Sequence, residues 1–332
     1  MRAKPGRRAT SYDVAAAAGV AQSTVSRCFL PESEVSDATR ARVVAVAATL
    51  GYVPNAIARS LITQRSDMVA LIVTEFTLEA NPAIVSGIGR ALAAHQQQLL
   101  LMPVADEAGA RAAAAAALQY PLDGLVVATT LAAASVRPFL ARGVPVVMFN
   151  RAAPLPGVDR VATDHAGAAR EVAAALYAAG HRRFVCLAGE ARFPVNQERR
   201  RGFVDQLATL GVGSVPILEA AQSYTGARTA FTAHTTRYGA PDAVFCVNDQ
   251  LAFGVLDACR FDLRQDGIAV VGFDDVAEAS HQGYDLTTVK QDIPALADAA
   301  VAMLRQRLEA PGERARHLLL PGMLIRRGSA WL

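Results

Sequence analysis

The chain has 332 residues, of which 52% are hydrophobic and 19% charged, enough for more than one domain with a buried core. No apolar run approaches the roughly 18 residues of a membrane span, and no apolar segment follows the basic residues 1–8 as a secretory signal would require. The four cysteines lack the spacing of a zinc site and are expected to be reduced thiols. We therefore expect a cytoplasmic protein without a metal or other cofactor.

Charge is distributed unevenly along the chain. The net charge is +3, but residues 1–65 carry nine Lys and Arg against four Asp and Glu, whereas the remainder carries 24 against 26. A basic head on an otherwise slightly acidic chain indicates that the first segment binds a polyanion. A soluble basic head without any partner is the alternative that charge alone leaves open.

The first helices of the head form a helix-turn-helix pattern. Thr10 and Asp13 have the spacing of a capping box, and the helix that follows, residues 12–18, stops at Gly19. A second helix, residues 22–29, begins only three residues later. Two short helices joined by a glycine-containing turn predict a helix-turn-helix.

A third helix and a polar surface complete the predicted head. Ser36 is the expected cap of a helix over residues 37–50, and Gly51 is the residue expected to end it. In a helix-turn-helix, the second helix enters the DNA major groove and its side chains contact base edges. The expected DNA-binding residues of this helix are Gln22, Ser23, Thr24, Ser26 and Arg27. A three-helix bundle with a merely polar surface helix is the alternative.

Several segments of the head closely resemble the lac repressor (LacI/GalR) family, in order and without gaps. They are residues 12–15, 18–20, 23–27, 35–36, 39–40, 51–52, 54–55 and 58–61. The resemblance implies a transcriptional regulator, a repressor, that binds double-stranded operator DNA as a homodimer or higher oligomer. Ala21 stands where family members usually carry Ser, and the loss of such a helix cap costs roughly 0.5–2 kcal/mol.

Residues 54–65 predict a hinge. The proline at position 54 suits the start of a helix of about two turns, which is too short to be stable alone in water. The resemblance implies that two such helices pair in the DNA minor groove. It further implies that Asn55, Ala58 and Arg59 line that groove, and that Leu61 wedges between base steps. An ordinary interdomain linker is the alternative.

From residue 66 onward, apolar strands alternate with helical stretches. The expected strands are residues 68–73, 99–102, 123–127, 144–148, 184–187, 244–247 and 268–272. Continuous apolar runs spaced by helices indicate parallel sheets that are buried on both faces. This part of the chain is therefore predicted to be an α/β domain.

The same family resemblance extends over the α/β part. Its matching segments are residues 81–82, 123–124, 144–147, 180–183, 199, 202–203, 241–242, 248–249, 271–275, 286–288 and 324–329. The implied fold class is an all-α helix-turn-helix head plus an α/β two-lobed, periplasmic-binding-protein-like (type I) sensor domain.

The resemblance also implies how the chain divides. The expected parts are a DNA-binding domain at 1–53, a hinge at 54–65 and an effector-binding domain at 66–332. Within the last, we expect an N-lobe of about 66–163 and 290–322 and a C-lobe of about 164–289 and 323–332. The chain would then cross between lobes near residues 164, 290 and 322.

Ligands of open α/β sheets bind beyond the carboxyl ends of the strands. The resemblance implies that three polar residues at such strand ends bind the effector, Asn150, Asn248 and Asp274, and that Arg199, expected at the start of a helix, is a fourth. Their donors and acceptors suit a sugar or a sugar derivative. Phe76, Phe193 and Tyr224 are the candidate apolar walls.

Each of these polar residues also has a simpler interpretation. Asn248 would cap a helix over residues 249–259, Asp274 would serve a turn, and Arg199 would belong to a solvated arginine run. Arg192, close to Arg199 in sequence, leaves a sugar acid open as the ligand, because arginine pairs well with carboxylates.

Two other classes of protein compete with a regulator. An extracytoplasmic sugar-binding protein without DNA function is the alternative function, but it would need a signal peptide and no helix-turn-helix. An enzyme would need a nucleophile elbow, a P-loop or a metal-ligand cluster, and Gly87 and Gly89 lack the third glycine of a dinucleotide fingerprint. We therefore expect no catalytic residue and no metal ligand. The expected partners are operator DNA, a small-molecule effector and a second copy of the chain, with no membrane.

Overall fold

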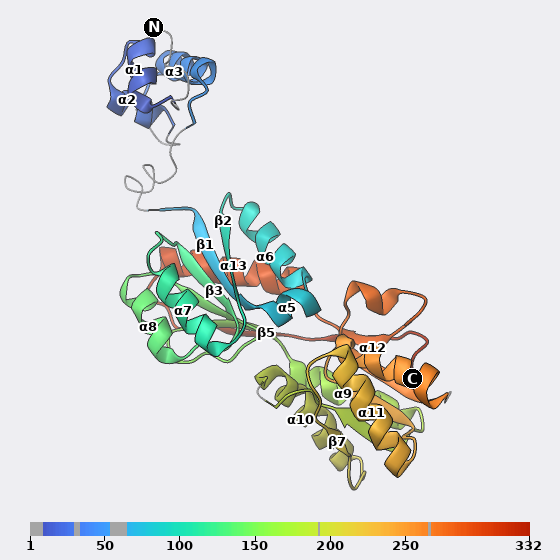
Figure 1. Ribbon diagram of the computed structural model, residues 1–332. Helices are drawn as coiled ribbons and strands as arrows, with labels where there is room; N and C mark the ends of the chain where they lie inside the picture. The colour runs from blue at the N-terminus through green and yellow to red at the C-terminus, as the bar shows by residue number, and fades with distance from the viewer. Residues whose placement is uncertain (1–8, 30–33, 54–64, 192, 265–266) are drawn as a thin grey trace. The chain divides into compact units, whose positions relative to one another are not determined.

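The structure is a computed structural model of residues 1–332 (Figure 1), and it describes residues 9–29, 34–53, 65–191, 193–264 and 267–332. The chain divides into two compact units, one formed by residues 1–67 with 121–123 and the other by the remaining residues. Within the described ranges, no helix is long and apolar enough to cross a membrane.

The head contains three helices, α1 (Ser11–Ala18), α2 (Gln22–Cys28) and α3 (Asp37–Leu50), within one residue of the predicted ends. The backbone N–H of Thr10 donates to Asp13 Oδ2 at 2.8 Å, and the backbone N–H of Asp13 donates to Thr10 Oγ1 at 3.4 Å, so the capping box is formed. Gly19 and Gly51 end α1 and α3 with φ of 65° and 63°, a conformation that glycine adopts without a steric penalty.

One valine from each helix forms the centre of the head. Val14 of α1, Val25 of α2 and Val43 of α3 are fully buried in one cluster between the three helices. Cys28 and Ala47 are buried beside them, and their small side chains let the helices approach closely. The head therefore has its own apolar core.

The first lobe of the sensor is built on a six-stranded parallel sheet in the order β11-β5-β4-β3-β1-β2. Its strands are β1 (Met68–Thr74), β2 (Gln98–Val104), β3 (Gly124–Ala128), β4 (Val146–Phe149), β5 (Asp159–Thr163) and β11 (His317–Leu320). Every residue of β3 and β4 is buried, as expected of strands that are covered on both faces.

Helices cover both faces of this sheet (Figure 1). They are α5 (Glu75–Ala80), α6 (Ala83–Ala93), α7 (Glu107–Ala117), α8 (Ala133–Ala141) and α13 (Ile293–Glu309). The pair α6 and α13 packs on the face that bears Val69 and Leu71, and α7 with α8 covers the other. A Cβ at Gly87 of α6 would lie 3.1 Å from Cγ2 of Ile293 in α13, so this glycine serves close helix packing.

The second lobe is built on another six-stranded sheet, in the order β12-β10-β9-β8-β6-β7, of which only β12 runs antiparallel to its neighbour. Its strands are β6 (Phe184–Leu187), β7 (Ile217–Leu218), β8 (Ala243–Cys246), β9 (Ala269–Asp274), β10 (Thr287–Lys290) and β12 (Met323–Ile325). Its helices are α9 (His165–Ala178), α10 (Pro194–Thr209), α11 (Tyr224–Tyr238) and α12 (Asp249–Asp257), the last followed by a π-helical turn, Ala258–Leu263.

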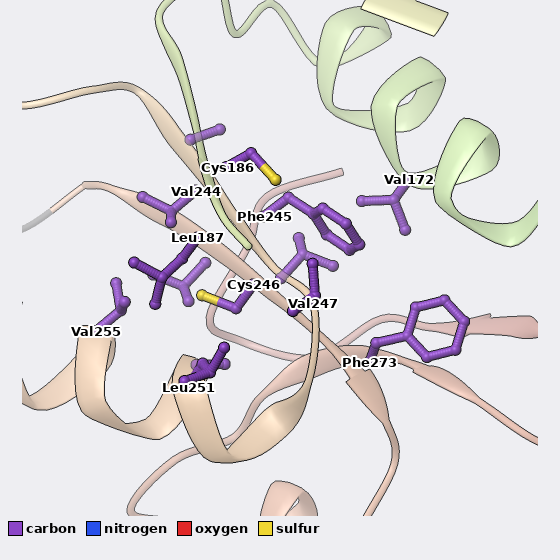
Figure 2. Close-up of a cluster of buried hydrophobic side chains, with 14 of the residues drawn as sticks. Val172, Cys186, Leu187, Val244, Phe245, Cys246, Val247, Leu251, Val255 and Phe273 are labelled. Atoms are coloured by element: carbon purple, nitrogen blue, oxygen red, sulfur yellow. The ribbon is translucent and has the colours of Figure 1, made fainter. Parts of the chain in front are cut away.

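Alternate residues of β8 pack on opposite faces of the second sheet (Figure 2). Phe245 points toward Val172 of α9, whereas Cys246 points toward Leu251 and Val255 of α12. This alternation is the period of a strand, and it explains why β8 has no polar residue. The core therefore holds the end of β8 in a fixed position.

The chain passes between the two sheets three times. It crosses at residue 164 after β5, at 291–292 after β10 and at 321–322 between β11 and β12. Because the carboxyl ends of parallel strands share one edge of a sheet, the residues that follow β4, β8 and β9 gather where the two lobes meet.

Candidate functional site

The second helix of the head presents the predicted DNA-reading residues at its surface. Ser23 and Arg27, four residues apart on one face of α2, are exposed. Gln22, Thr24 and Ser26 are partly exposed. These side chains form a polar surface around a cationic arginine, which is the type of surface that reads base edges in a major groove.

Gln22 is already hydrogen-bonded within the head. Its Nε2 donates to the hydroxyl of Ser11 at 3.1 Å and to that of Ser26 at 3.2 Å. These two bonds link the start of α1 to α2 and orient the amide. A base that accepts a hydrogen bond from Nε2 of Gln22 has to replace one of these hydroxyls.

The start of α2 lacks a side-chain cap. Ala21 has the extended conformation of an N-cap, with φ of −70° and ψ of 151°, and no side-chain hydrogen bond caps the helix. Thr10 and Ser36, in contrast, cap α1 and α3 by accepting from Asp13 N and Thr39 N. Among the three helices of the described head, α2 alone has no side-chain cap.

The hinge residues Asn55, Ala58, Arg59 and Leu61 lie outside the described residues, as does Arg192. Their predicted roles remain predictions.

The predicted effector residues come together in one cavity at the junction of the two lobes, hereafter the effector cavity. Asn150 follows β4 of the first lobe, Asn248 follows β8, and Asp274 is the last residue of β9. Arg199, in the second turn of α10 rather than at its start, completes the polar wall. Phe76 of α5 and Phe193 before α10 line the same cavity, with ring centroids 5.8 Å apart.

Two of these residues have an unusual backbone. Asn150 has φ of 52° and Asp274 has φ of 127°, both in a region that disfavours L-amino acids with a side chain. Such conformations persist only where the surroundings enforce them, and they cluster at functional sites. The surrounding structure therefore holds the backbone of both strand ends in a conformation that fixes the direction of these two side chains.

Arg199 is fixed by contacts on every side. Its Nη2 contacts Asp274 Oδ1 at 2.9 Å, its Nη1 donates to the carbonyl of Val247 at 2.6 Å, and its Nε donates to His165 Nδ1 at 3.3 Å. The guanidinium also lies over the ring of Phe273, with 3.7 Å between its Cζ and the ring centroid. Burial and the charge of Arg199 hold the pKa of His165 well below its usual range, so this imidazole is neutral.

Asn248 has the structural role that the sequence left open. Its Oδ1 accepts a hydrogen bond from Leu251 N at 2.9 Å and caps α12. Its side chain still lines the effector cavity, so capping and ligand contact are compatible. Tyr224 is different: its hydroxyl donates to Asp257 at 2.7 Å, and it does not line this cavity, so its prediction as an apolar wall was wrong.

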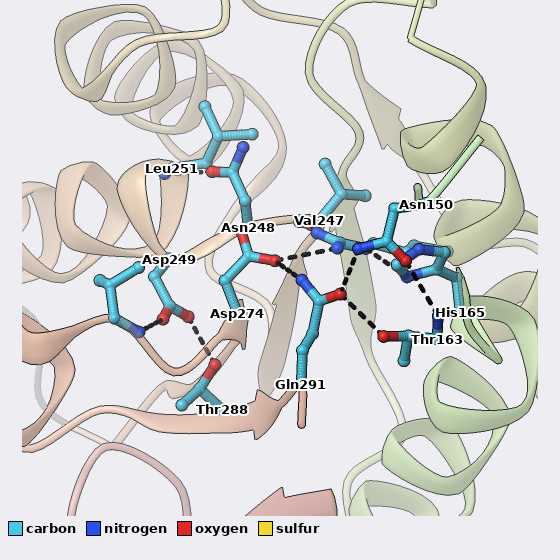
Figure 3. A network of polar contacts seen from close by, with 12 residues as sticks. Asn150, Thr163, His165, Val247, Asn248, Asp249, Leu251, Asp274, Thr288 and Gln291 are labelled. Atoms are coloured by element: carbon cyan, nitrogen blue, oxygen red, sulfur yellow. Dashed lines mark hydrogen bonds and ion pairs between the residues drawn. The ribbon is translucent and has the colours of Figure 1, made fainter. Parts of the chain in front are cut away.

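Gln291 joins the polar groups of the two lobes, and it was not among the predicted site residues. Figure 3 shows its amide between Asp274 on one side and Asn150 and Thr163 on the other. Nε2 donates to Asp274 Oδ1 at 2.7 Å, and Oε1 accepts from Asn150 Nδ2 at 2.9 Å and from Thr163 Oγ1 at 2.8 Å. Arg151 is a second lining residue that the sequence did not predict.

A buried carboxylate lies beside this network. Asp249 accepts from the hydroxyl of Thr288 at 2.5 Å and from the backbone N–H of Val276 at 2.9 Å, which ties α12 to β10 and to the turn after β9 (Figure 3). Burial, together with the nearby Asp274, raises the pKa of Asp249 from 3.8 to about 7. In the described part of the chain, no group of His, Cys, Asp and Glu is arranged to hold a metal ion.

Both parts of the chain match known protein families. Residues 10–55 match the family described as "Bacterial regulatory proteins, lacI family", and residues 173–330 match the "Periplasmic binding protein-like domain". The regulator CelR of Thermobifida fusca is 31% identical over 97% of this chain and 98% of its own length. The ribose operon repressor of Escherichia coli strain K12 is 30% identical over 97% of this chain and all of its own length.

Solved structures agree with the sequence relatives. A lac repressor dimer bound to operator and an anti-inducer has a TM-score of 0.88 at 25% identity and covers 98% of this chain and 100% of its own. A CelR–cellobiose complex has a TM-score of 0.72 at 29% identity and covers 97% of this chain and 100% of its own.

The fold and these likenesses define a class: DNA-binding transcriptional regulators that combine a helix-turn-helix head with a periplasmic-binding-protein-like sensor. The chain belongs to the lacI family of bacterial regulatory proteins. The predicted family and fold class are confirmed, and the alternative of a binding protein without DNA function is not favoured.

Proposed function

We propose that the protein is a cytoplasmic repressor that binds operator DNA as a homodimer and changes its operator affinity when a sugar or sugar derivative occupies the effector cavity. The observation that carries this proposal is the convergence of Asn150, Arg199, Asn248 and Asp274 on one cavity, in a chain that also has a helix-turn-helix head. The printed names of two relatives, a ribose operon repressor and a CelR–cellobiose complex, support a sugar.

Operator recognition is assigned to the head and the hinge. Gln22, Ser23, Thr24, Ser26 and Arg27 would contact base edges in the major groove. The hinge residues Asn55, Ala58, Arg59 and Leu61 would act in the minor groove between two half-sites, where a leucine wedge favours a kinked duplex. Residues 1–53, 54–65 and 66–332 would then be the DNA-binding domain, the hinge and the effector domain.

Effector recognition is assigned to the cavity between the lobes. Amide, carboxylate and guanidinium groups can donate to and accept from hydroxyl groups of a sugar, while Phe76 and Phe193 offer apolar surface to its ring. The protein acts by binding and not by catalysis. Coupling between two such sites is typically 1–3 kcal/mol, about a 5- to 150-fold change in affinity.

A gel shift on duplexes from the region upstream of the protein's own gene tests this proposal. Arg27→Ala removes an exposed charge from α2, and Arg42→Ala removes an exposed charge from α3, so the pair is matched in charge. We expect Arg27→Ala to lose preference for the operator over random DNA, by about 1–3 kcal/mol, and Arg42→Ala to keep that preference. Equal preference in the two variants would contradict the reading role of α2.

A further inference from the structure

The charged groups in and around the effector cavity do not balance. Two guanidinium groups, of Arg151 and Arg199, lie on its described wall with one carboxylate, that of Asp274. Asp274 is already bound by Arg199 at 2.9 Å and by Gln291 at 2.7 Å. This carboxylate therefore compensates the charge of Arg199 and leaves Arg151 without a carboxylate partner.

The other nearby carboxylate is also shared with an arginine. Glu198 attracts the Arg151 guanidinium, but its Oε1 contacts Nη2 of Arg160 at 3.8 Å. Three arginines thus face two carboxylates in this cluster, and His165 adds no further positive charge because it is neutral. Asp249, with a pKa of about 7, is only partly ionised near neutral pH, so these groups keep an excess of positive charge.

Arg151 is the residue that carries this surplus. Its Nη1 donates to the backbone carbonyl of its neighbour Asn150 at 2.8 Å, and no Asp or Glu oxygen of the described residues lies within 4.0 Å of its guanidinium nitrogens. Burial and the like charge of Arg199 lower the pKa of Arg151 to about 10, so it stays positive at neutral pH. Its remaining donors are available on the cavity wall.

An uncompensated guanidinium favours one kind of ligand. A neutral sugar that fills the cavity would remove water from Arg151 without supplying an opposite charge, which is unfavourable. A carboxylate or phosphate group would replace that water and match the fork of guanidinium donors with charge-assisted hydrogen bonds.

We propose that the effector is anionic, a polyhydroxylated carboxylate or phosphate ester, and that its charged group binds Arg151. The hydroxyl groups of the ligand then face the amides of Asn150 and Asn248, and its carbon skeleton lies near Phe76 and Phe193. This inference rests on the proposed function, because it names the ligand class of the same cavity.

Thermal unfolding of the full-length protein with paired ligands tests the inference. The pairs are D-glucose with D-gluconate, D-galactose with D-galacturonate, and D-ribose with D-ribose 5-phosphate, so carboxylates and phosphate esters are separate arms. We expect the acidic member of at least one pair to raise the Tm in a saturable way, and its neutral parent to bind about tenfold more weakly or worse.

Two variants assign the effect to the guanidinium. Arg151→Gln should weaken binding of the stabilising acid by about tenfold or more, whereas Arg151→Lys, which keeps the charge, should retain part of the affinity. Arg111→Gln, an exposed arginine on α7 that does not line the cavity, is the matched control and should bind the acid like the wild type.

Operator binding, measured in parallel by gel shift, distinguishes a failure of this inference from a failure of the proposed function. The inference is overturned if neutral sugars stabilise the protein as well as their acids do, if no acid stabilises it, or if Arg151→Gln binds the acid like the wild type. With operator binding intact, any of these results leaves the regulator role standing. Loss of operator binding by the wild type would overturn the proposed function itself.

Discussion

The side chain of Gln291 donates a 2.7 Å hydrogen bond from Nε2 to Oδ1 of Asp274. Asp274 ends a strand of the second lobe, and the oxygen of the same amide accepts from Thr163 at the end of a strand of the first lobe. One amide therefore connects the polar groups of both lobes. A ligand that competes for either bond changes the contacts that hold the lobes together, which is what a binding signal requires.

Replacing this amide should uncouple ligand binding from the change in operator affinity. We expect Gln291→Leu to bind operator DNA but to lose most of the effector-dependent change in affinity, about 5- to 150-fold in coupled proteins. Fluorescence anisotropy of labelled operator, with and without the most stabilising ligand, measures this change. Gln119→Leu, at an exposed glutamine in the first lobe, is the matched control. A Gln291→Leu protein with the full ligand response would exclude this coupling role.

The recognition helix should gain order from a cap. We expect Ala21→Ser to stabilise α2 by about 0.5–2 kcal/mol, because the extended backbone at this position suits a serine that accepts from the following amides. Hydrogen exchange of the amides of residues 22–25 in the full chain should slow accordingly. Ser36→Ala, which removes the existing cap of α3, should have the opposite effect on the amides of residues 37–40. Unchanged exchange in Ala21→Ser would show that the missing cap has no effect on the helix.

Most of the head was predictable because its signals are local. The capping box at Thr10 and Asp13 and the two helix-ending glycines are set by residues within one turn of each helix end. The strands β1, β6 and β8 were predictable for a similar reason, since each is a continuous apolar run. The short strands β7, β11 and β12 each lie at a sheet edge, and none of their residues is fully buried.

The cavity was predictable only in part. Asn150, Asn248 and Asp274 follow apolar strands, and strand ends point to ligand sites in α/β sheets. Gln291 and His165 follow β10 and β5, two strands that were not predicted, and Arg151 is the chain neighbour of Asn150. Their contacts depend on which side chains the fold places opposite them, and no local pattern specifies this. Tyr224 was misassigned because an aromatic residue near the site in sequence gives no information on the direction of its side chain.

The corrected role of Tyr224 can be compared with that of Phe193. We expect Phe193→Ala to lower the affinity for the most stabilising ligand, since Phe193 lines the cavity. Tyr224→Phe should leave the ligand affinity unchanged and lower the free energy of unfolding by about 1 kcal/mol, because it removes the hydrogen bond to Asp257. Isothermal titration and urea unfolding measure the two effects. A large loss of ligand affinity in Tyr224→Phe would show that Tyr224 does contribute to the ligand site.

The contribution of Asp249 to the stability of the sensor should fall as pH rises toward neutrality. In the folded protein its carboxyl keeps its proton up to about pH 7, whereas in the unfolded chain it ionises near its ordinary pKa of 3.8. Between these two pH values the folded state binds more protons than the unfolded state. The contribution of Asp249 to the free energy of unfolding therefore decreases with pH, by up to about 4 kcal/mol in total.

Urea unfolding between pH 4 and 8 measures this slope. The Asp249→Asn side chain cannot ionise, and it keeps an oxygen that can accept from Val276 N. Relative to the wild type, the stability of this variant should therefore increase as pH rises from 4 to 7. Asp298→Asn, at an exposed position of α13, is the matched control and should follow the wild type. Identical pH profiles for Asp249→Asn and the wild type would show that Asp249 does not titrate in this range.

Operator affinity measured against salt concentration, with and without the most stabilising ligand, shows whether the protein is a ligand-controlled DNA-binding regulator. We expect an affinity for one duplex above that for random DNA. This affinity should fall steeply with salt, by a log–log slope of about −0.9 per phosphate contact, and it should shift when the ligand is added. The contradicting result is a purified, folded protein that shows no salt-dependent affinity for any duplex from the region upstream of its own gene.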